Sequence, residues 1–166
     1  TVRAMAVGME LVRTLKEEGY RILATGEMGI GNTTTSSAMA AALLKCEVPF
    51  VTGKGAGLSE KGLLHKQEVI GQAIRKYDLY EKDVFTILET VGGLDIAGLV
   101  GVCIGGAIYR MPIVLDGVIS LVAALTAEKI APGTKEYLLT SHQGKEPAAK
   151  FLLKALEKEA VLNAHM

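Results

Sequence analysis

The sequence predicts an α/β fold, with a mainly parallel, Rossmann-like sheet flanked by helices. Short apolar runs typical of strands alternate with longer segments that have helical spacing. Each glycine-rich or polar loop is expected to follow a strand, and ligands bind sheets of this kind at the carboxyl ends of their strands. No segment resembles a linker, and 166 residues are typical of one domain.

The composition excludes two classes of partner. The chain has 18 basic and 18 acidic residues, so it lacks the excess of Lys and Arg with which nucleic-acid binders neutralise phosphates. The uncharged, largely apolar stretch 96–109 is too short to span a bilayer. No signal peptide is visible, and Cys46 and Cys103 are isolated, with Cys103 expected to be a buried thiol. We therefore expect a cytoplasmic protein that binds neither nucleic acid nor membrane.

The first quarter of the chain is expected to open a βαβ unit. Apolar residues at helical spacing predict a helix over 4–18, and YRILAT (20–25) is typical of a short strand. A glycine-rich loop (26–32) and an Ala-rich helix (33–44) follow. Strand, glycine loop and helix in this order are the beginning of a βαβ unit.

A second glycine loop (53–57) follows PFVT (49–52), which is interpreted as a short strand. Ser59 is expected to cap a helix over 60–77, because Ser satisfies free N–H groups in the first turn. Residues 83–91 are expected to form a shorter helix, capped by the Asp that opens it.

The second half predicts a buried helix over 94–109, whose glycines serve packing against the sheet or another subunit. PIVLD (112–116) is a continuous apolar run, as in a parallel strand covered on both faces. A helix over 119–130, a strand over 137–140 and an amphipathic helix over 146–159 complete the chain.

The segment GEMGIGNTTT (26–35) is the most informative motif. Glycines allow backbone N–H groups to face a ligand, and the following helix adds its positive end and free donors. The alternative is a tight βα turn capped by Thr, although such a turn does not need three glycines and three threonines. We therefore predict that an anion binds at Gly29, Gly31, Asn32 and Thr33.

This loop is similar to two nucleotide-binding motifs and matches neither of them. Asn32 stands where the Walker A motif has Lys, and Thr34 stands where the dinucleotide fingerprint has its third Gly. PIVLD (112–116) resembles a Walker B strand, which leaves a degenerate P-loop NTPase as an alternative. Without that Lys, the loop suits one phosphate better than a triphosphate.

Charged side chains near the glycine loops are further candidates. Glu27 is either a solvated loop acid or a group that accepts a ribose hydroxyl or stabilises a positive sugar centre. Lys54 and Lys66 are candidates for the positive charge that the first loop lacks. Lys66 is otherwise a surface lysine.

Polar residues after the later strands complete the candidate site. Asp116 ends a buried strand, where it either contacts a ligand or caps the following helix. Ser141 and His142 follow another strand and are candidate ligand contacts. The histidines have no metal-ligand spacing, so we predict no metal and no cofactor, and His165 is expected at a frayed terminus.

Six motifs occur in one order along residues 20–144, and together they resemble the nicotinate-nucleotide–dimethylbenzimidazole phosphoribosyltransferase family. The resemblance implies a homodimeric transferase of cobalamin biosynthesis. A ring nitrogen of 5,6-dimethylbenzimidazole attacks C1′ of nicotinate mononucleotide, nicotinate leaves, and inversion gives α-ribazole 5′-phosphate. The motifs are GEMGIGNTTT (26–35), VTGKGAGL (51–58), HKQ (65–67), VGGLDIAGLVG (91–101), PIVLDG (112–117) and YLLTSHQG (137–144).

The resemblance also implies roles for individual residues. The family's phosphate loop corresponds to Gly29, Gly31, Asn32 and Thr33, its lysine to Lys66, its serine to Ser141 and its supporting glutamate to Glu27. The family's general base lies in a Gly-Glu-Gly loop, and this chain ends before such a motif. The family's N-terminal segment that helps to hold the benzimidazole is absent too.

We therefore expect residues 1–166 to be one nucleotide-binding domain of a longer enzyme. As given, the chain should bind nucleotide better than it turns it over, because a general base typically contributes about 10²–10⁴-fold to the rate. The alternative is a naturally short, non-catalytic nucleotide-binding module.

Overall fold

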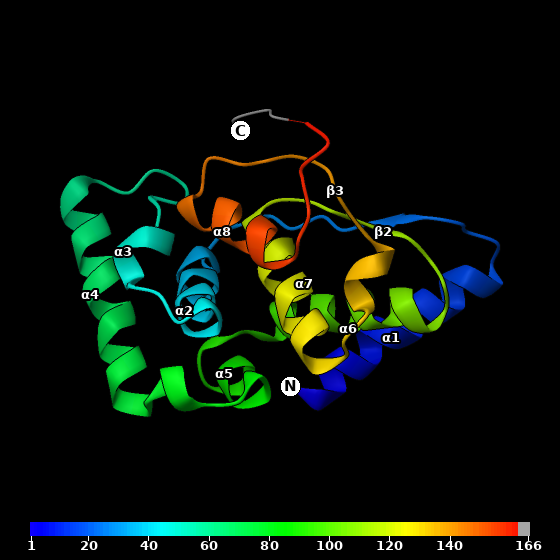
Figure 1. The fold of residues 1–166 in the computed structure, drawn as a ribbon, viewed down its shortest axis with the longest axis horizontal. Helices are drawn as coiled ribbons and strands as arrows, with labels where there is room; N and C mark the ends of the chain where they lie inside the picture. The colour runs from blue at the N-terminus through cyan, green and yellow to red at the C-terminus, as the bar shows by residue number, and fades with distance from the viewer. Residues whose placement is uncertain (163–166) are drawn as a thin grey trace.

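The computed structural model describes residues 1–162 and shows a small sheet with α1, α6 and α7 on one side of it (Figure 1). His165 lies outside the described residues. The elements are α1 (Val2–Glu17), β1 (Leu23–Ala24), α2 (Thr33–Leu44), α3 (Val48–Val51), α4 (Glu60–Tyr77), η1 (Leu79–Glu81), α5 (Val84–Val91), α6 (Leu94–Ile108), β2 (Ile113–Leu115), α7 (Val118–Ile130), η2 (Thr134–Tyr137), β3 (Leu138–Thr140) and α8 (Pro147–Ala155).

The sheet has three parallel strands in the order β1-β2-β3. Ile113 of the central strand lies opposite Leu23 on one side and Leu138 on the other. Ile113 and Leu115 point to the same face and are fully buried, whereas Val114 between them is only partly buried and Leu139 of β3 is 48% exposed. The sheet is therefore buried on one face, and the predicted cover on both faces is wrong. The predicted α/β class is confirmed, with shorter strands and more helix than the sequence suggested.

Close packing was predicted for the glycines of α6 against the sheet or another subunit. Gly106 does pack against Ile113 of the sheet, whereas Gly101 and Gly105 pack against the helix α1. α1 packs along α6 (Figure 1), and a Cβ on Gly101 would lie 2.0 Å from the carbonyl oxygen of Met5. A Cβ on Gly105 would lie 3.1 Å from Cα of Met9. Gly101 therefore lets the two helix backbones approach more closely than any side chain would allow.

Two predicted elements are wrong. Residues 49–52 are not a strand, because Pro49 lies in the first turn of α3, where its missing N–H costs nothing. The last helix ends at Ala155 and not at Glu159, and the chain reverses at Glu157, which has φ of +55°. Since α3 precedes the loop 53–57, that glycine loop does not follow a strand as expected.

The two predicted helix caps are confirmed. Ser59 accepts a hydrogen bond from the Gly62 N–H at 3.1 Å, and the Asp83 carboxylate accepts from the N–H groups of Phe85 and Thr86 at 3.0 Å. None of the helices within residues 1–162 combines the length and the apolar character needed to cross a membrane.

Candidate functional site

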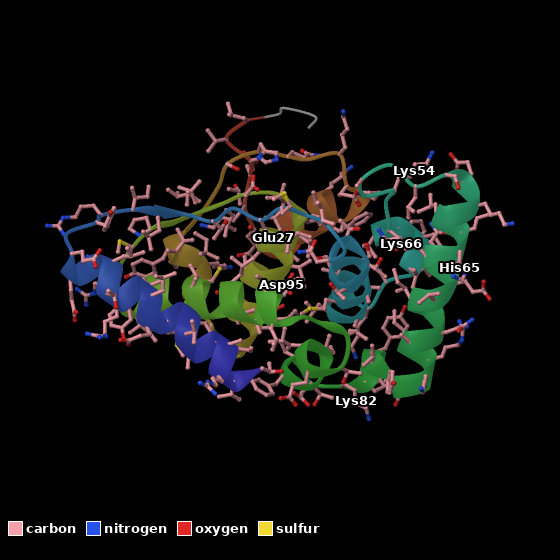
Figure 2. The ribbon with its side chains drawn as sticks, turned by 180° about the vertical axis from the view of Figure 1, so that it is seen from behind. Glu27, Lys54, His65, Lys66, Lys82 and Asp95 are labelled. Atoms are coloured by element: carbon pink, nitrogen blue, oxygen red, sulfur yellow. The ribbon has the colours of Figure 1, made fainter. Side chains whose placement is uncertain are left out.

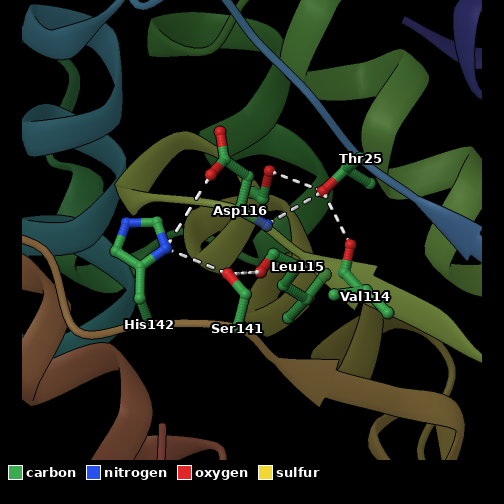
Figure 3. A network of polar contacts seen from close by, with 7 residues as sticks. Thr25, Val114, Leu115, Asp116, Ser141 and His142 are labelled. Atoms are coloured by element: carbon green, nitrogen blue, oxygen red, sulfur yellow. Dashed lines mark hydrogen bonds and ion pairs between the residues drawn. The ribbon is translucent and has the colours of Figure 1, made fainter. Parts of the chain in front are cut away.

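The loops after the three parallel strands meet at one edge of the sheet. A network of polar contacts joins them (Figure 3). The Thr25 hydroxyl, directly after β1, accepts the N–H of Asp116 at 3.1 Å and lies 2.9 Å from the hydroxyl of Ser120. Thr25 was not among the predicted site residues, because a Thr at a strand end carries no signal of this long-range contact.

Ser141 and His142 form the third part of this edge. The Ser141 hydroxyl donates to the carbonyl of Leu115 at 2.6 Å, and its oxygen lies 3.0 Å from Nδ1 of His142 (Figure 3). A carbonyl only accepts, so the network assigns the hydrogen of that second contact to Nδ1. The same Nδ1 lies 3.9 Å from the Asp116 carboxylate, and the imidazole is mostly buried.

The first glycine loop has the backbone of an anion site. Gly29 and Gly31 have φ of +73° and +83°, a region that side chains rarely tolerate. The Glu27 carboxylate folds back and accepts the N–H of Gly29 at 2.5 Å. The Gly29 N–H, one of the donors predicted to bind a ligand, is therefore hydrogen-bonded to a carboxylate of the chain itself.

Asn32 is engaged inside the protein. Its side-chain amide donates to the carboxylate of Asp95 at 2.8 Å, which ties the start of α2 to the start of α6. The residue is only 7% exposed, and its Oδ1 has no hydrogen-bond partner within residues 1–162. Asn32 is thus buried against α6 and does not present its side chain to the surface of the loop.

Lys66 is buried and joins the two glycine loops. Its ammonium donates to the Thr33 hydroxyl at 3.1 Å and to the Gly53 carbonyl at 3.0 Å, and the residue is 5% exposed. Burial lowers the pKa of Lys66, and the nearby Glu146 carboxylate opposes this shift. An ammonium has three donors, so one N–H is left for a ligand. The surface alternative is wrong.

Lys54 differs from Lys66 in its surroundings. It lies in the second glycine loop (Figure 2) and pairs with Glu60. Its side chain is 47% exposed. Lys66, and not Lys54, therefore brings a buried positive charge to the start of α2.

A cavity of about 360 Å³ opens between these loops. It brings together three predicted residues, Gly29, Thr33 and His142, and a neighbouring cavity of about 320 Å³ adds Gly31. Glu27, Asn32, Lys66, Asp116 and Ser141 do not line these two cavities; Glu27, Lys66 and Ser141 hydrogen-bond to residues that do.

The first cavity also contains residues that the sequence analysis missed. Gly55 comes from the second glycine loop, Gly117 is the N-cap residue of α7, and Glu146 precedes α8. The PIVLDG motif held a signal for Gly117, since a glycine after a buried strand often opens a helix at a ligand. Within residues 1–162, no three His, Cys, Asp or Glu side chains are grouped to hold a metal ion.

Comparison with known proteins identifies the family. A family model described as phosphoribosyltransferase matches residues 1–166. The chain belongs to this phosphoribosyltransferase family. A nicotinate-nucleotide–dimethylbenzimidazole phosphoribosyltransferase from Clostridium acetobutylicum is 44% identical over 165 residues, and one from Halalkalibacterium halodurans is also 44% identical. The resemblance inferred from the six motifs is confirmed.

A solved structure of CobT from Thermus thermophilus matches this chain with a TM-score of 0.93 and 34% identity. The match covers 99% of this chain and 49% of the Thermus chain. The Clostridium acetobutylicum relative is likewise covered over 47% of its length. The chain thus spans about half the length of the relatives that it matches.

Proposed function

We propose that this chain supplies the nucleotide-binding part of an enzyme that transfers phosphoribose from nicotinate mononucleotide to 5,6-dimethylbenzimidazole. The observation that carries the proposal is a cavity lined by the two glycine loops and the start of α7, with the buried Lys66 ammonium bonded to Thr33 in its wall. One ammonium and several backbone donors suit a single phosphate monoester. Relatives at 44% identity bear the name of this activity.

The proposed reaction exchanges one base for another at C1′. A ring nitrogen of the benzimidazole forms a bond to C1′ from the face opposite nicotinate. The C1′–nitrogen bond to nicotinate breaks, its electron pair stays with nicotinate, and the benzimidazole proton passes to a base. The products are α-ribazole 5′-phosphate and nicotinate.

We assign the residues of this chain to binding and orientation. Gly31, Thr33 and Lys66 hold the phosphate. Gly29 joins them when the Glu27 carboxylate leaves its N–H and turns to the positive charge that develops at C1′. Asn32 acts through α2, whose N-terminus it ties to Asp95. His142, which lines the cavity, contacts the nucleotide in this proposal, and Asp116 and Ser141 orient His142 from the ends of β2 and β3.

The general base belongs to a segment beyond the described residues in this proposal. Leu162 donates a hydrogen bond to the carbonyl of Ser141 at 2.9 Å, so the chain after α8 returns to the edge that carries the site. A cytoplasmic homodimer of the longer enzyme, with this chain as its nucleotide-binding domain, is part of the same proposal.

A chimera tests the proposal directly. Residues 1–166 replace the matching 165 residues of the Clostridium acetobutylicum relative, which is 44% identical over them. We expect α-ribazole 5′-phosphate in a chromatographic assay with nicotinate mononucleotide and 5,6-dimethylbenzimidazole. A folded chimera that binds nicotinate mononucleotide and forms no product would instead support a non-catalytic binding module.

A further inference from the structure

Glu146 connects α8 to the second glycine loop. Its carboxylate accepts the N–H of Gly55 at 2.9 Å, across 91 positions of the chain. The approach is close at Gly53 too, since a Cβ there would lie 2.2 Å from the Glu146 carboxylate and 2.7 Å from the Pro147 ring. Gly53 is therefore a position where only glycine lets the loop reach α8.

The same loop holds Lys66. Gly53 accepts one hydrogen bond from the ammonium through its carbonyl, and Thr33 on α2 accepts another. Both of these partners are neutral. Glu146, the N-cap residue of α8, is the charged group that bonds this loop, and its charge opposes the effect of burial on the pKa of Lys66.

The other charged groups near the loop are Lys145, which lines the same cavity as Gly55, and two pairs of side chains. Lys54 pairs with Glu60 at the surface, and His65 lies 3.9 Å from Glu68 on the exposed side of α4. A buried ammonium with only neutral partners would lose its proton more readily than one beside a carboxylate. Glu146 thus supplies both a backbone anchor and the opposite charge.

We propose that Glu146 is a positioning residue, whose carboxylate fixes the second glycine loop and keeps Lys66 charged beside the cavity. The role rests on the proposed function in one respect, that Lys66 holds the phosphate of the nucleotide. Glu146 itself acts through Lys66 and Gly55 and is not a catalytic residue.

Two substitutions separate the two parts of this role. Glu146→Gln keeps an oxygen that can accept the Gly55 N–H and removes the charge, whereas Glu146→Ala removes both. We expect the pKa of Lys66 to fall in both variants, because each removes the carboxylate charge. Amide hydrogen exchange at Gly55 should become faster in Glu146→Ala and stay close to the wild-type rate in Glu146→Gln.

Both quantities are measured by NMR on the ligand-free chain of residues 1–166, with ¹³C-labelled lysine and Lys66→Met for assignment. Glu89→Gln, on the exposed side of α5, is the matched control and should change neither quantity. Circular dichroism checks that each variant is folded. If Glu146→Ala is unfolded, the pKa of Lys66 in Glu146→Gln alone tests the effect of the charge. An unchanged Lys66 pKa in folded Glu146→Gln overturns the proposal.

Titration with nicotinate mononucleotide from about pH 7 to about pH 10 then links this role to binding. The affinity should decline at a lower pH in Glu146→Gln than in the wild type, because deprotonation of Lys66 removes a charge-assisted hydrogen bond. If Lys66 shifts as expected and the wild-type chain does not bind the nucleotide, the positioning role stands and the proposed function fails.

Discussion

At the scale of single residues, Lys66 has the surroundings of a ligand-binding group. Lysines are almost never fully buried unless they are paired, and Lys66 is 5% exposed with two hydrogen bonds to neutral oxygens. Its burial lowers its pKa, so the fold maintains this position at a cost. A bound phosphate would satisfy the donor that remains.

Replacement of Lys66 by Met should weaken binding of nicotinate mononucleotide by about 10–100-fold, because a hydrogen bond to a charged group contributes about 1.5–3 kcal/mol. Lys61→Met is the matched control, since Lys61 is exposed on the same helix. Isothermal titration calorimetry measures both affinities. Equal affinities in the two variants would contradict the assignment of Lys66 to the phosphate.

At the scale of elements, local signals predicted most helices correctly, and local signals also explain the errors. Ser59 and Asp83 predict where helices begin, because their side chains accept hydrogen bonds from backbone N–H groups within the next three residues. PFVT (49–52) looks like a strand from its β-branched and aromatic residues, but Pro49 fits the first turn of a helix equally well. Short apolar runs are ambiguous in this way.

The packing of α6 against α1 can be tested with two substitutions on α6. Gly101→Ala should lower the free energy of unfolding by about 1–3 kcal/mol or more, because its Cβ would overlap the backbone of Met5. Gly98→Ala on the same helix should raise it by about 0.5–1 kcal/mol, since Ala favours helix over Gly and its Cβ meets no atom of residues 1–162 within 4 Å.

Urea unfolding of the two variants and the wild type measures this difference. Opposite signs are expected at positions only one turn apart, which separates the close contact from helix propensity. Similar stabilities of Gly101→Ala and Gly98→Ala would show that α1 and α6 are not packed through Gly101.

At the scale of the whole molecule, parallel topology explains why the site was partly predictable. Strand ends of one sheet share an edge, so Asp116 and Ser141 were correctly expected near the first glycine loop. The bonds of Asn32 to Asp95 and of Glu146 to Gly55 join residues 63 and 91 positions apart. No pattern in the sequence marks such pairs, because they depend on how helices pack.

The buried thiol of Cys103 makes global stability depend on pH. Burial raises its pKa from 9.0 to about 12, so the folded chain holds this proton where the unfolded chain releases it. Stability from this group is therefore complete below about pH 9 and falls as pH rises towards about pH 12.

Urea unfolding should show a Cys103-dependent loss of about 2 kcal/mol between about pH 8 and about pH 10.5. Cys103→Ala removes the titrating group, and its unfolding free energy should decline less over the same range. Parallel pH profiles of the wild type and Cys103→Ala would show that the thiol is not buried in solution.

The central claim is that the cavity binds a nucleoside monophosphate through its phosphate. The most direct measurement is calorimetric titration of residues 1–166 with nicotinate mononucleotide, nicotinate riboside and magnesium-ATP. We predict that the mononucleotide binds about 10–100-fold more tightly than the riboside, because only it carries the phosphate, and that magnesium-ATP does not compete. Equal affinity for riboside and mononucleotide, or preferential binding of magnesium-ATP, would contradict the claim.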